Sequence, residues 1–348
     1  MKILVTGGAG FIGSNFIRYI LGKYPEYEVV NFDKLTYAGN LDNLKGVEGT
    51  EGVDSRLRGN DKGRGNDSPR RTSGNDNSRY KFVKGDIADE KAVDELFAAE
   101  NFDVILNYAA ETHVDRSITG PRDFITTDIF GTFTLLEAVK KYGVKRYVQI
   151  STDEVFGSTE DGAFTEESSF MPNSPYSASK AGADHLCRAY FVTYGVPVIV
   201  THSCNVYGPN QYPEKVIPLF VTNLLSGKKV PLYGDGKNVR EWLYTEDHCS
   251  AIDAILHNGK IGEVYNIGSG HELANIELTQ MILKNFGVGE EMIEYVEDRL
   301  GHDRRYSVDS KKLRDELGWK PRFEFEKTLS DTIDWYKNNK WWWEKLIG

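Results

Sequence analysis

The N-terminal stretch "KILVTGGAGFIGSNFIRYIL" constrains the fold most, because it joins a strand-like run to an amphipathic helical segment through a glycine-rich turn. The three glycines of the turn are Gly7, Gly10 and Gly13. In this context Gly7 permits a tight turn, Gly10 lets the backbone approach a pyrophosphate, and Gly13 packs the helix against the strand. The stretch therefore predicts a dinucleotide-binding turn, with the phosphates at the helix N-terminus.

Five further apolar runs continue the pattern along the first half of the chain. They are short, continuous and rich in β-branched residues, which is typical of buried parallel strands. Helical patterns separate several of them, at 89–101 and 123–142. The alternation predicts an α/β fold, a Rossmann-type doubly wound parallel sheet that binds ligands at the carboxyl ends of its strands. The runs are "YEVVNFD", "YKFVKGD", "DVILNYAA", "RYVQIST" and "VPVIVTHS".

The second predicted strand ends in a carboxylate. Asp33 lies 20 residues beyond Gly13, where it can accept hydrogen bonds from a ribose 2′-hydroxyl and would repel a 2′-phosphate, so NAD is favoured over NADP. Asp86 ends the third strand near the expected adenine ring, although it could equally cap the helix that begins near Asp89. The other predicted cofactor contacts are Phe11, Ile12, Lys34, Thr36, Ile87, Ala109, Ala110 and Thr127, together with Tyr176 and Lys180.

The composition narrows the class of protein. The net charge of −10 over 348 residues argues against a nucleic acid or an anionic membrane as partner. Cys187, Cys204 and Cys249 have no CxxC spacing, so neither a disulfide framework nor a metal site is expected. With a strand at the N-terminus instead of a signal peptide, and no apolar run long enough to span a membrane, we expect a cytoplasmic protein.

The stretch "SPYSASK" contains Tyr176 and Lys180, four residues apart and therefore on one face of a helix. A lysine ammonium beside a phenol stabilises the phenolate, which makes the tyrosine a usable base near neutral pH. One strand earlier, "STDEVFG" places Thr152 before two carboxylates, Asp153 and Glu154, at the end of a buried run. The chain thus offers a base, a hydroxyl and an acid pair.

These motifs together resemble the extended short-chain dehydrogenase/reductase family, many members of which act on nucleotide sugars. Within that family the chain is similar to the dTDP-glucose 4,6-dehydratases from its N-terminus to the C-terminal tryptophans. The resemblance implies a homodimeric, NAD-dependent lyase, with 123–142 and 176–194 as dimer helices. The stretches that carry it are "FDKLTYAGN", "AAETHVDRSI", "STDEVFG", "CNVYGP", "PEKVIP", "YGDGKNVREWLYTEDH" and "GHDRRY".

The resemblance also implies roles for the residues. Tyr176 removes the proton of the sugar 4-hydroxyl while the C4 hydride passes to NAD, and Thr152 hydrogen-bonds the same oxygen. Glu154 then takes the C5 proton, Asp153 protonates the departing 6-hydroxyl, and the hydride returns to C6. Both acids can reach one sugar only if the chain turns after Thr152, because consecutive side chains of a strand point to opposite faces.

The predicted substrate-binding residues lie mostly in the second half of the chain. Two arginines among them suit a pyrophosphate, because a planar guanidinium can bond its oxygens bidentately. The set consists of Thr112, Thr152, Asn205, Lys215, Val216, Pro231, Tyr233, Arg240, Asn275, Arg299 and His302.

We expect two domains. Residues 1–204 with 241–268 form the predicted NAD-binding Rossmann domain, and 205–240 with 269–348 form a smaller C-terminal α/β domain that binds the nucleotide sugar. A segment rich in Gly, Asn, Asp and Arg, 46–79, has few large apolar residues and is predicted to be a flexible insertion.

Three alternatives stay open. A nucleotide-sugar 4-epimerase needs the tyrosine, the lysine and a hydroxyl, but not the acid pair. A 4,6-dehydratase for a UDP-, CDP- or GDP-linked sugar would use the same chemistry with a different nucleotide pocket. A non-catalytic NAD-sensing protein on this fold would have no use for Asp153 and Glu154 beside Tyr176 and Lys180.

Overall fold

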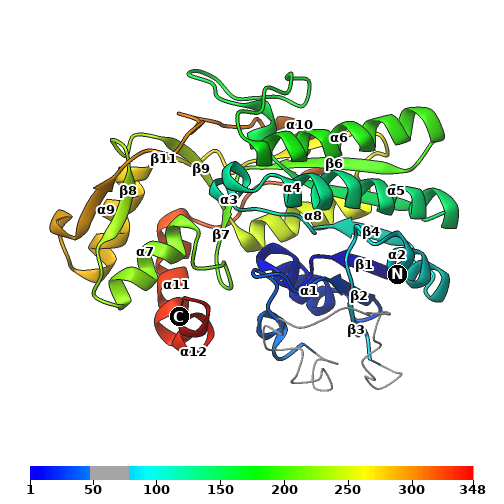
Figure 1. The fold of residues 1–348 in the computed structure, drawn as a ribbon, viewed down its shortest axis with the longest axis horizontal. Coiled ribbons are helices and arrows are strands. Elements are labelled where there is room, and N and C mark those ends of the chain that lie inside the picture. Colours follow the sequence, from blue (N-terminus) through cyan, green and yellow to red (C-terminus); the bar gives the residue numbers. More distant parts are fainter. Residues whose placement is uncertain (48–77, 348) are drawn as a thin grey trace. The chain divides into compact units, whose positions relative to one another are not determined.

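The computed structural model describes residues 1–47 and 78–347 (Figure 1), and its contacts divide the chain into two compact units. The predicted insertion lies outside the described residues except at its two ends, 46–47 and 78–79. The predicted domain boundaries stay a prediction. Unit 1 consists of Met1–Ser151, Pro175–Thr201 and Ile255–Val264, and unit 2 of Thr152–Ser174, His202–Ala254 and Tyr265–Gly348.

The six predicted apolar runs form six strands of a seven-stranded sheet in the order β10-β6-β5-β4-β1-β2-β3, and β10 from later in the chain adds the seventh. The pairs β1–β2, β1–β4, β2–β3 and β4–β5 are all parallel. The predicted Rossmann-type sheet is therefore confirmed. The strands are β1 (Lys2–Thr6), β2 (Glu28–Asp33), β3 (Tyr80–Lys84), β4 (Val104–Asn107), β5 (Arg146–Thr152), β6 (Val198–Ser203) and β10 (Val264–Ile267).

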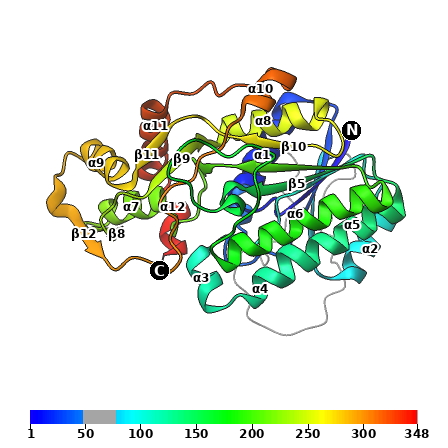
Figure 2. The ribbon, with the colours of Figure 1, turned by 90° about the horizontal axis from the view of Figure 1, so that it is seen from above.

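Amphipathic helices cover the sheet of unit 1 because each presents one apolar stripe to it. Figure 2 shows α2, α5 and α6 along one face and α1 on the other. The core under α2, α5 and α6 includes Leu96, Leu135, Leu136 and Cys187. The helices are α1 (Phe11–Lys23), α2 (Glu90–Ala99), α3 (Val114–Thr119), α4 (Arg122–Phe124), α5 (Gly131–Tyr142) and α6 (Pro175–Tyr194), with the short 3₁₀ helix η1 (Leu41–Leu44).

The segment predicted as one helix over 123–142 is not uniform. A π-helical stretch, η4 (Ile125–Phe130), separates α4 from α5. Single π turns inside helices occur frequently at functional sites, because the extra residue redirects the side chains around it. This stretch carries Thr127, a predicted cofactor contact.

Unit 2 has two small sheets, β11-β9-β7 and β12-β8, and its own apolar core. The C-terminal Trp342 and Trp343 are buried in that core. Among the described residues, every helix is too short or too polar to span a bilayer. The strands are β7 (Asn205–Tyr207), β8 (Val230–Tyr233), β9 (Val239–Tyr244), β11 (Glu272–Ala274) and β12 (Ile293–Val296). The helices are η5 (Asp153–Phe156), α7 (Val216–Leu225), α8 (Thr245–Asn258, which continues into unit 1), α9 (Asn275–Phe286), η6 (Glu290–Met292), α10 (Lys311–Leu317), α11 (Phe325–Asn338), α12 (Lys340–Trp343) and η7 (Glu344–Leu346).

Candidate active site

The glycine turn between β1 and α1 leaves no room for side chains. Gly7 has φ +65°, and a Cβ there would lie 2.6 Å from the backbone nitrogen of Ala109. A Cβ at Gly13 would lie 2.6 Å from the Gly7 carbonyl oxygen. Helix α1 begins at Phe11 without a side-chain cap, so backbone N–H groups of its first turn are available to a ligand. The turn fits the diphosphate of NAD, because backbone donors and a positive helix end lie where side chains are absent.

Asp33 lies at the end of β2 and organises this turn. One carboxylate oxygen accepts from Ala9 N at 2.8 Å and the other accepts from Leu35 N at 2.7 Å. Burial raises the pKa of Asp33, and the two backbone donors oppose that rise. A carboxylate has about four acceptor positions, so Asp33 can still accept from a ribose hydroxyl. Asp33 can therefore be the predicted ribose contact and also hold the glycine turn in place, a structural role that the sequence did not reveal.

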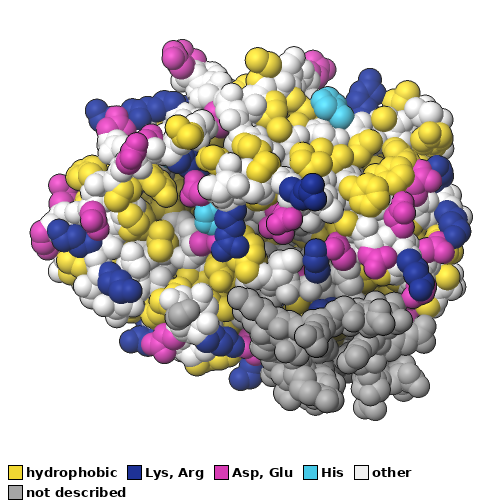
Figure 3. All heavy atoms as spheres, viewed as in Figure 1, with side chains coloured by type: hydrophobic (Ala, Val, Ile, Leu, Met, Phe, Trp, Pro, Cys, Tyr) yellow, Lys and Arg dark blue, Asp and Glu magenta, His cyan; other side chains and the backbone are white. Residues whose placement is uncertain are grey.

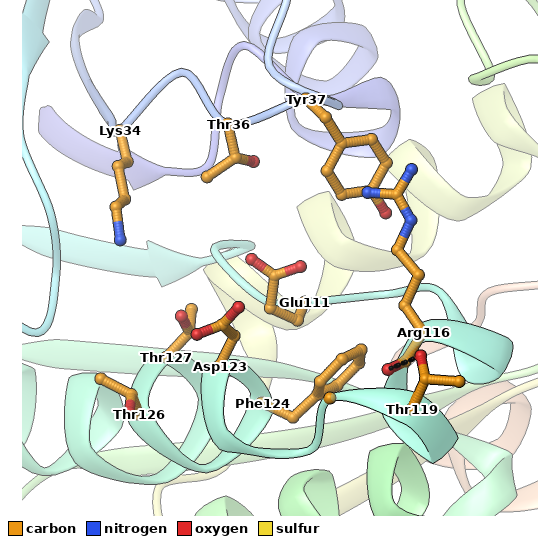
Figure 4. Close-up of a pocket in the computed structure, with 11 residues that line it drawn as sticks. Lys34, Thr36, Tyr37, Glu111, Arg116, Thr119, Asp123, Phe124, Thr126 and Thr127 are labelled. Carbon is orange, nitrogen blue, oxygen red and sulfur yellow. Dashed lines mark hydrogen bonds between the residues drawn. The ribbon is translucent and has the colours of Figure 1, made fainter. Parts of the chain in front are cut away.

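Beyond Asp33, unit 1 has a cavity of about 450 Å³ (Figure 4). The guanidinium of Arg116 lies 3.7 Å from the ring centroid of Tyr37 and stacks on it. Lys34 is paired with Asp86, with Nζ and Oδ2 2.6 Å apart. The cavity is lined by Lys34, Thr36 and Thr127, three predicted cofactor contacts, and by Tyr37, Glu111, Arg116, Thr119, Gly120, Asp123, Phe124 and Thr126, which were not predicted.

The remaining predicted cofactor contacts also lie in unit 1. Ile87 follows β3 and is buried, and a Cβ at Gly131 would lie 2.5 Å from its Cδ1 atom. Ala109, Ala110 and the predicted substrate contact Thr112 lie in the loop between β4 and α3. Phe11 and Ile12 form the first turn of α1.

The predicted base lies on α6. Tyr176 and Lys180 are both buried, with 9% and 4% of their surface exposed. The ammonium of Lys180 donates to the carbonyl oxygen of Ile150 at 2.8 Å, which fixes it at the end of β5. Phe124 meets the Tyr176 ring edge-on, with the centroids 6.2 Å apart. The ordered ammonium one helical turn from the phenol is the arrangement that stabilises a phenolate.

The acid pair follows the last residue of β5. The chain turns there into η5, and the Thr152 hydroxyl caps that turn by accepting from Glu154 N at 3.2 Å. The same hydroxyl lies 3.2 Å from Asp153 Oδ1. Asp153 is almost fully buried, and its Oδ2 atom makes no hydrogen bond within the described part of the chain. A buried oxygen without a partner is costly, so it is suited to a ligand that supplies one.

The surroundings of Asp153 disfavour its charge. Burial comes first, followed by the carboxylates of Glu154 and Glu241, and together they raise the pKa of Asp153 well above its ordinary value, although the Thr152 hydrogen bond and Arg240 oppose the rise. Glu241 on β9 is fully buried and accepts from Gly270 N at 2.6 Å. These surroundings favour the protonated form of Asp153, which is the form that the predicted role as general acid requires.

The surroundings of Glu154 differ. Burial raises the pKa of this carboxyl as well, but Arg299, Arg240 and Lys215 oppose the rise by stabilising the ionised form. Asp303 acts with burial, as a smaller effect. More cations therefore act on Glu154 than on Asp153, where Arg240 alone opposes the rise as a charge, so the ionised form is less disfavoured at Glu154.

Arg240 is held rigidly within unit 2. It donates to the carbonyl oxygens of Val239 at 2.7 Å and Asp303 at 2.9 Å, and its guanidinium lies 4.1 Å from the centre of the Tyr306 ring. His302 Nδ1 lies 2.6 Å from Asp298 Oδ1, yet burial and then Arg299 lower the pKa of His302 to about 4. His302 is thus neutral near pH 7.

The other predicted substrate contacts occupy the ends of elements in unit 2. Asn205 Oδ1 is buried without a hydrogen bond to the described residues. Their places are the start of β7 (Asn205), the start of α7 (Lys215 and Val216), β8 (Pro231 and Tyr233), the start of α9 (Asn275) and the loop after β12 (Arg299 and His302).

The structure thus groups the predicted residues in two sets. Tyr176, Lys180 and the cofactor contacts belong to unit 1, and the chain passes into unit 2 between Ser151 and Thr152. Thr152, the acid pair and all predicted substrate contacts except Thr112 belong to unit 2. Sequence reasoning missed Glu241 and Asp303, although both stand in the stretches "REWLYTEDH" and "GHDRRY" that carried the resemblance.

Comparison with known proteins gives consistent matches. The family model described as "GDP-mannose 4,6 dehydratase" matches residues 4–59 and 51–332. The chain is 48% identical to dTDP-glucose 4,6-dehydratase of Streptomyces antibioticus, over 99% of this chain and 95% of that one. It is also 48% identical to the "low-salt glycan biosynthesis protein Agl12" of Haloferax volcanii, over 97% and 98% of the two chains.

A solved structure agrees with the sequence matches. The crystal structure of DesIV, a dTDP-glucose 4,6-dehydratase of Streptomyces venezuelae with NAD and TYD bound, superposes with a TM-score of 0.88 at 47% identity. It covers 99% of this chain, and the match includes 100% of that chain. The chain therefore belongs to the family of nucleotide-sugar 4,6-dehydratases that the GDP-mannose 4,6 dehydratase model describes.

Proposed function

We propose that the chain is an NAD-dependent hydro-lyase that converts dTDP-glucose to dTDP-4-keto-6-deoxyglucose. The observation that carries the reaction type is the buried acid pair, of which Asp153 has carboxylates and Glu154 has cations as its main charged neighbours. A 4-epimerase returns the hydride to C4 and has no use for such a pair. The choice of dTDP rests on relatives named dTDP-glucose 4,6-dehydratase that match nearly the whole chain.

The oxidation step falls to the residues of unit 1. When bound, NAD would supply a hydride acceptor for C4 and, once reduced, a hydride donor for C6. The Tyr176 phenolate takes the proton of the 4-hydroxyl, and the Lys180 ammonium stabilises that phenolate. Thr152 would donate a hydrogen bond to the same sugar oxygen. Oxidation of C4 to a ketone makes the neighbouring C5 proton acidic.

The elimination falls to the acid pair. Glu154, ionised through its cationic neighbours, takes the proton from C5, and the electron pair of that bond forms the C5–C6 double bond. Asp153, kept protonated, gives its proton to the 6-hydroxyl, which leaves as water. When the hydride returns to C6, Glu154 returns its proton to C5. Tyr176 then holds the proton of the 4-hydroxyl and Asp153 lacks the proton that it gave to the water, so exchange of one proton from Tyr176 to Asp153 through solvent restores both groups, and the net change is the loss of one water.

The remaining substrate contacts would bind the nucleotide. Arg299 and Arg240 would bond the pyrophosphate, and the rigid support of Arg240 would orient its planar face. Asn205 offers a buried oxygen that still lacks a donor among the described residues.

Mass spectrometry of products from a panel of dTDP-, UDP-, CDP- and GDP-linked glucose and mannose tests the proposal. We expect the loss of one water from dTDP-glucose. A change in sugar configuration without loss of water would identify an epimerase, and dehydration of another nucleotide sugar in preference to dTDP-glucose would correct the nucleotide.

We also propose that the enzyme is a cytoplasmic homodimer. Ile125, Phe130, Val192 and Tyr194 expose large apolar side chains on η4 and α6, and Figure 3 shows hydrophobic side chains on the surface over α5 and α6. Aromatic contacts join Phe130 to Tyr194 through Phe133 and Tyr190 in one row. Phe130→Glu should yield a monomer in sedimentation velocity, whereas an unchanged dimer would exclude this face.

The proposed cytoplasmic location rests on the cysteines. The three buried free cysteines suit a reducing compartment.

A further inference from the structure

A buried carboxylate in the π-helical stretch η4 has no part in the proposed steps. Asp128 is 2% exposed, although it lies in a segment whose periodicity predicts a plain amphipathic helix. The stretch packs tightly on α6, because a Cβ at Gly182 would lie 2.7 Å from Ile129 Cδ1. One turn earlier, Phe124 contacts the ring of Tyr176. Asp128 thus lies in the segment that packs on the catalytic helix.

The hydrogen bonds of Asp128 connect two parts of the site. Its Oδ1 accepts from the backbone N–H of Glu111, in the loop that carries the cofactor contacts after β4, at 2.9 Å. Its Oδ2 accepts from the Ser179 hydroxyl at 2.6 Å. Ser179 immediately precedes Lys180, and its hydroxyl also lies 2.8 Å from the carbonyl oxygen of Tyr176. One carboxylate therefore ties the cofactor loop to the turn between the base and its lysine.

The charged neighbours of Asp128 come from two elements. Lys180 on α6 stabilises its ionised form, whereas Asp184 on the same helix, which accepts from Ser151 Oγ at 2.7 Å, disfavours it. Glu111 faces it from the loop after β4. Burial raises the pKa of Asp128 to about 6, with the attraction of Lys180 acting against the rise. The carboxylate is therefore mostly ionised at pH 7 and above.

We propose that Asp128 is a positioning residue of the oxidation step, whose hydrogen bonds align the cofactor loop with α6 and whose negative charge tunes the Tyr176–Lys180 pair. The inference rests on the proposed function of that pair as base and ammonium. A negative charge raises the pKa of every neighbouring titratable group, because it favours their protonated forms. Removing it lowers the pKa of the phenol, so the base is active at lower pH.

Asp128→Asn tests the charge, because the side-chain amide keeps the shape and can still accept from Glu111 N and donate to Ser179. The titration of Tyr176 is measured in the NAD-bound protein as tyrosinate absorbance, with the Tyr176→Phe protein in the same background subtracted. We expect the titration to move to lower pH by roughly half to one unit. The acidic limb of kcat/KM should move in the same direction.

Two matched variants separate charge from structure. Ser179→Ala removes one hydrogen bond but leaves the carboxylate, so it should lower the rate and move the titration by less than about 0.3 unit. Asp94→Asn removes the same charge from a half-exposed carboxylate on α2 of unit 1 and should leave the titration where it is. A titration that stays in place in Asp128→Asn, or that moves equally in Ser179→Ala, would overturn the proposed electrostatic role.

The titration does not depend on the substrate. If the protein failed to dehydrate dTDP-glucose but the phenol titration moved as expected, the proposed function would fail while the role of Asp128 in tuning Tyr176 would stand. If dehydration occurred and the titration stayed in place, the opposite would hold.

Discussion

The two units place chemistry in different kinds of surroundings. In unit 1 backbone groups position the proposed base, Tyr176, and its lysine, since the Lys180 ammonium donates to the Ile150 carbonyl oxygen, and the glycine turn packs closely on Ala109. In unit 2 the acid pair lies among charged side chains from three separate segments of the chain, which supply Lys215, the neighbours Arg240 and Glu241, and Arg299. Proton abstraction from a hydroxyl needs one aligned base. Elimination needs two like groups in different protonation states, and only an asymmetric field provides that.

The largest effect should come from unit 1. Tyr176→Phe removes the base while keeping the ring against Phe124, so C4 oxidation should slow by roughly a hundred- to ten-thousandfold. The measurement is the single-turnover rise of reduced-nicotinamide absorbance after mixing with dTDP-glucose. Tyr142→Phe is the matched control, because that hydroxyl bonds Asp94 on another helix, and its rate should be unchanged. A normal rate of C4 oxidation in Tyr176→Phe would contradict the assignment of oxidation to unit 1 and elimination to unit 2.

A smaller effect should come from the cations of unit 2. Arg299→Gln removes the cation that most opposes the raised pKa of Glu154, so this carboxyl should stay protonated up to a higher pH. Elimination should fall by roughly tenfold at pH 6 and less at pH 8. Product formation over that pH range measures it, while KM reports the loss of a substrate contact separately.

Arg304→Gln serves as the control for Arg299→Gln, because Arg304 is exposed and paired with Asp235. Its pH profile should match that of the unaltered enzyme. An Arg299→Gln profile that only scales down, without the greater loss at acid pH, would contradict the electrostatic account of the base.

The smallest effect concerns stability. The pKa of Asp153 is raised in the folded state above its ordinary value of 3.8, so its contribution to stability is fully present below pH 3.8 and is lost as the pH rises through the folded value. Asp153→Asn removes that loss. The variant should therefore melt a few degrees above the unaltered protein at pH 8, and close to it at pH 4, in calorimetry at one scan rate. A lower melting temperature at pH 8 would contradict the raised pKa of this buried carboxyl.

Local patterns predicted much of unit 1. The strands β1 to β6 match the six apolar runs, and Gly7 and Gly13 have the close contacts that their spacing predicts. The π turn at Ile125–Phe130 could not be predicted, because the residues keep an amphipathic helical pattern and the distortion comes from packing on α6. The hydrogen bonds that Asp33 accepts from Ala9 N and Leu35 N could not be predicted either, because they depend on tertiary structure.

For unit 2 the sequence predicted which residues belong to the site but not how they are arranged around the acid pair. The stretches that resemble the dehydratases supplied Arg240, Arg299 and His302, and the turn required after Thr152 is present. The different charged neighbours of Asp153 and Glu154 come from segments that only the folded chain brings near them. Glu241 in particular resembles an ordinary strand residue until its burial beside Asp153 is known.

The most direct test of the account follows oxidation and dehydration together in Glu154→Gln and Asp153→Asn. After mixing with dTDP-glucose, reduced-nicotinamide absorbance reports the first step and quenched mass spectrometry reports the loss of water. Both variants should form reduced cofactor within about tenfold of the normal rate, while dehydrated product falls by roughly a hundredfold or more. Loss of both signals in parallel, or normal dehydration in either variant, would contradict the assignment of oxidation to Tyr176 and of elimination to the acid pair.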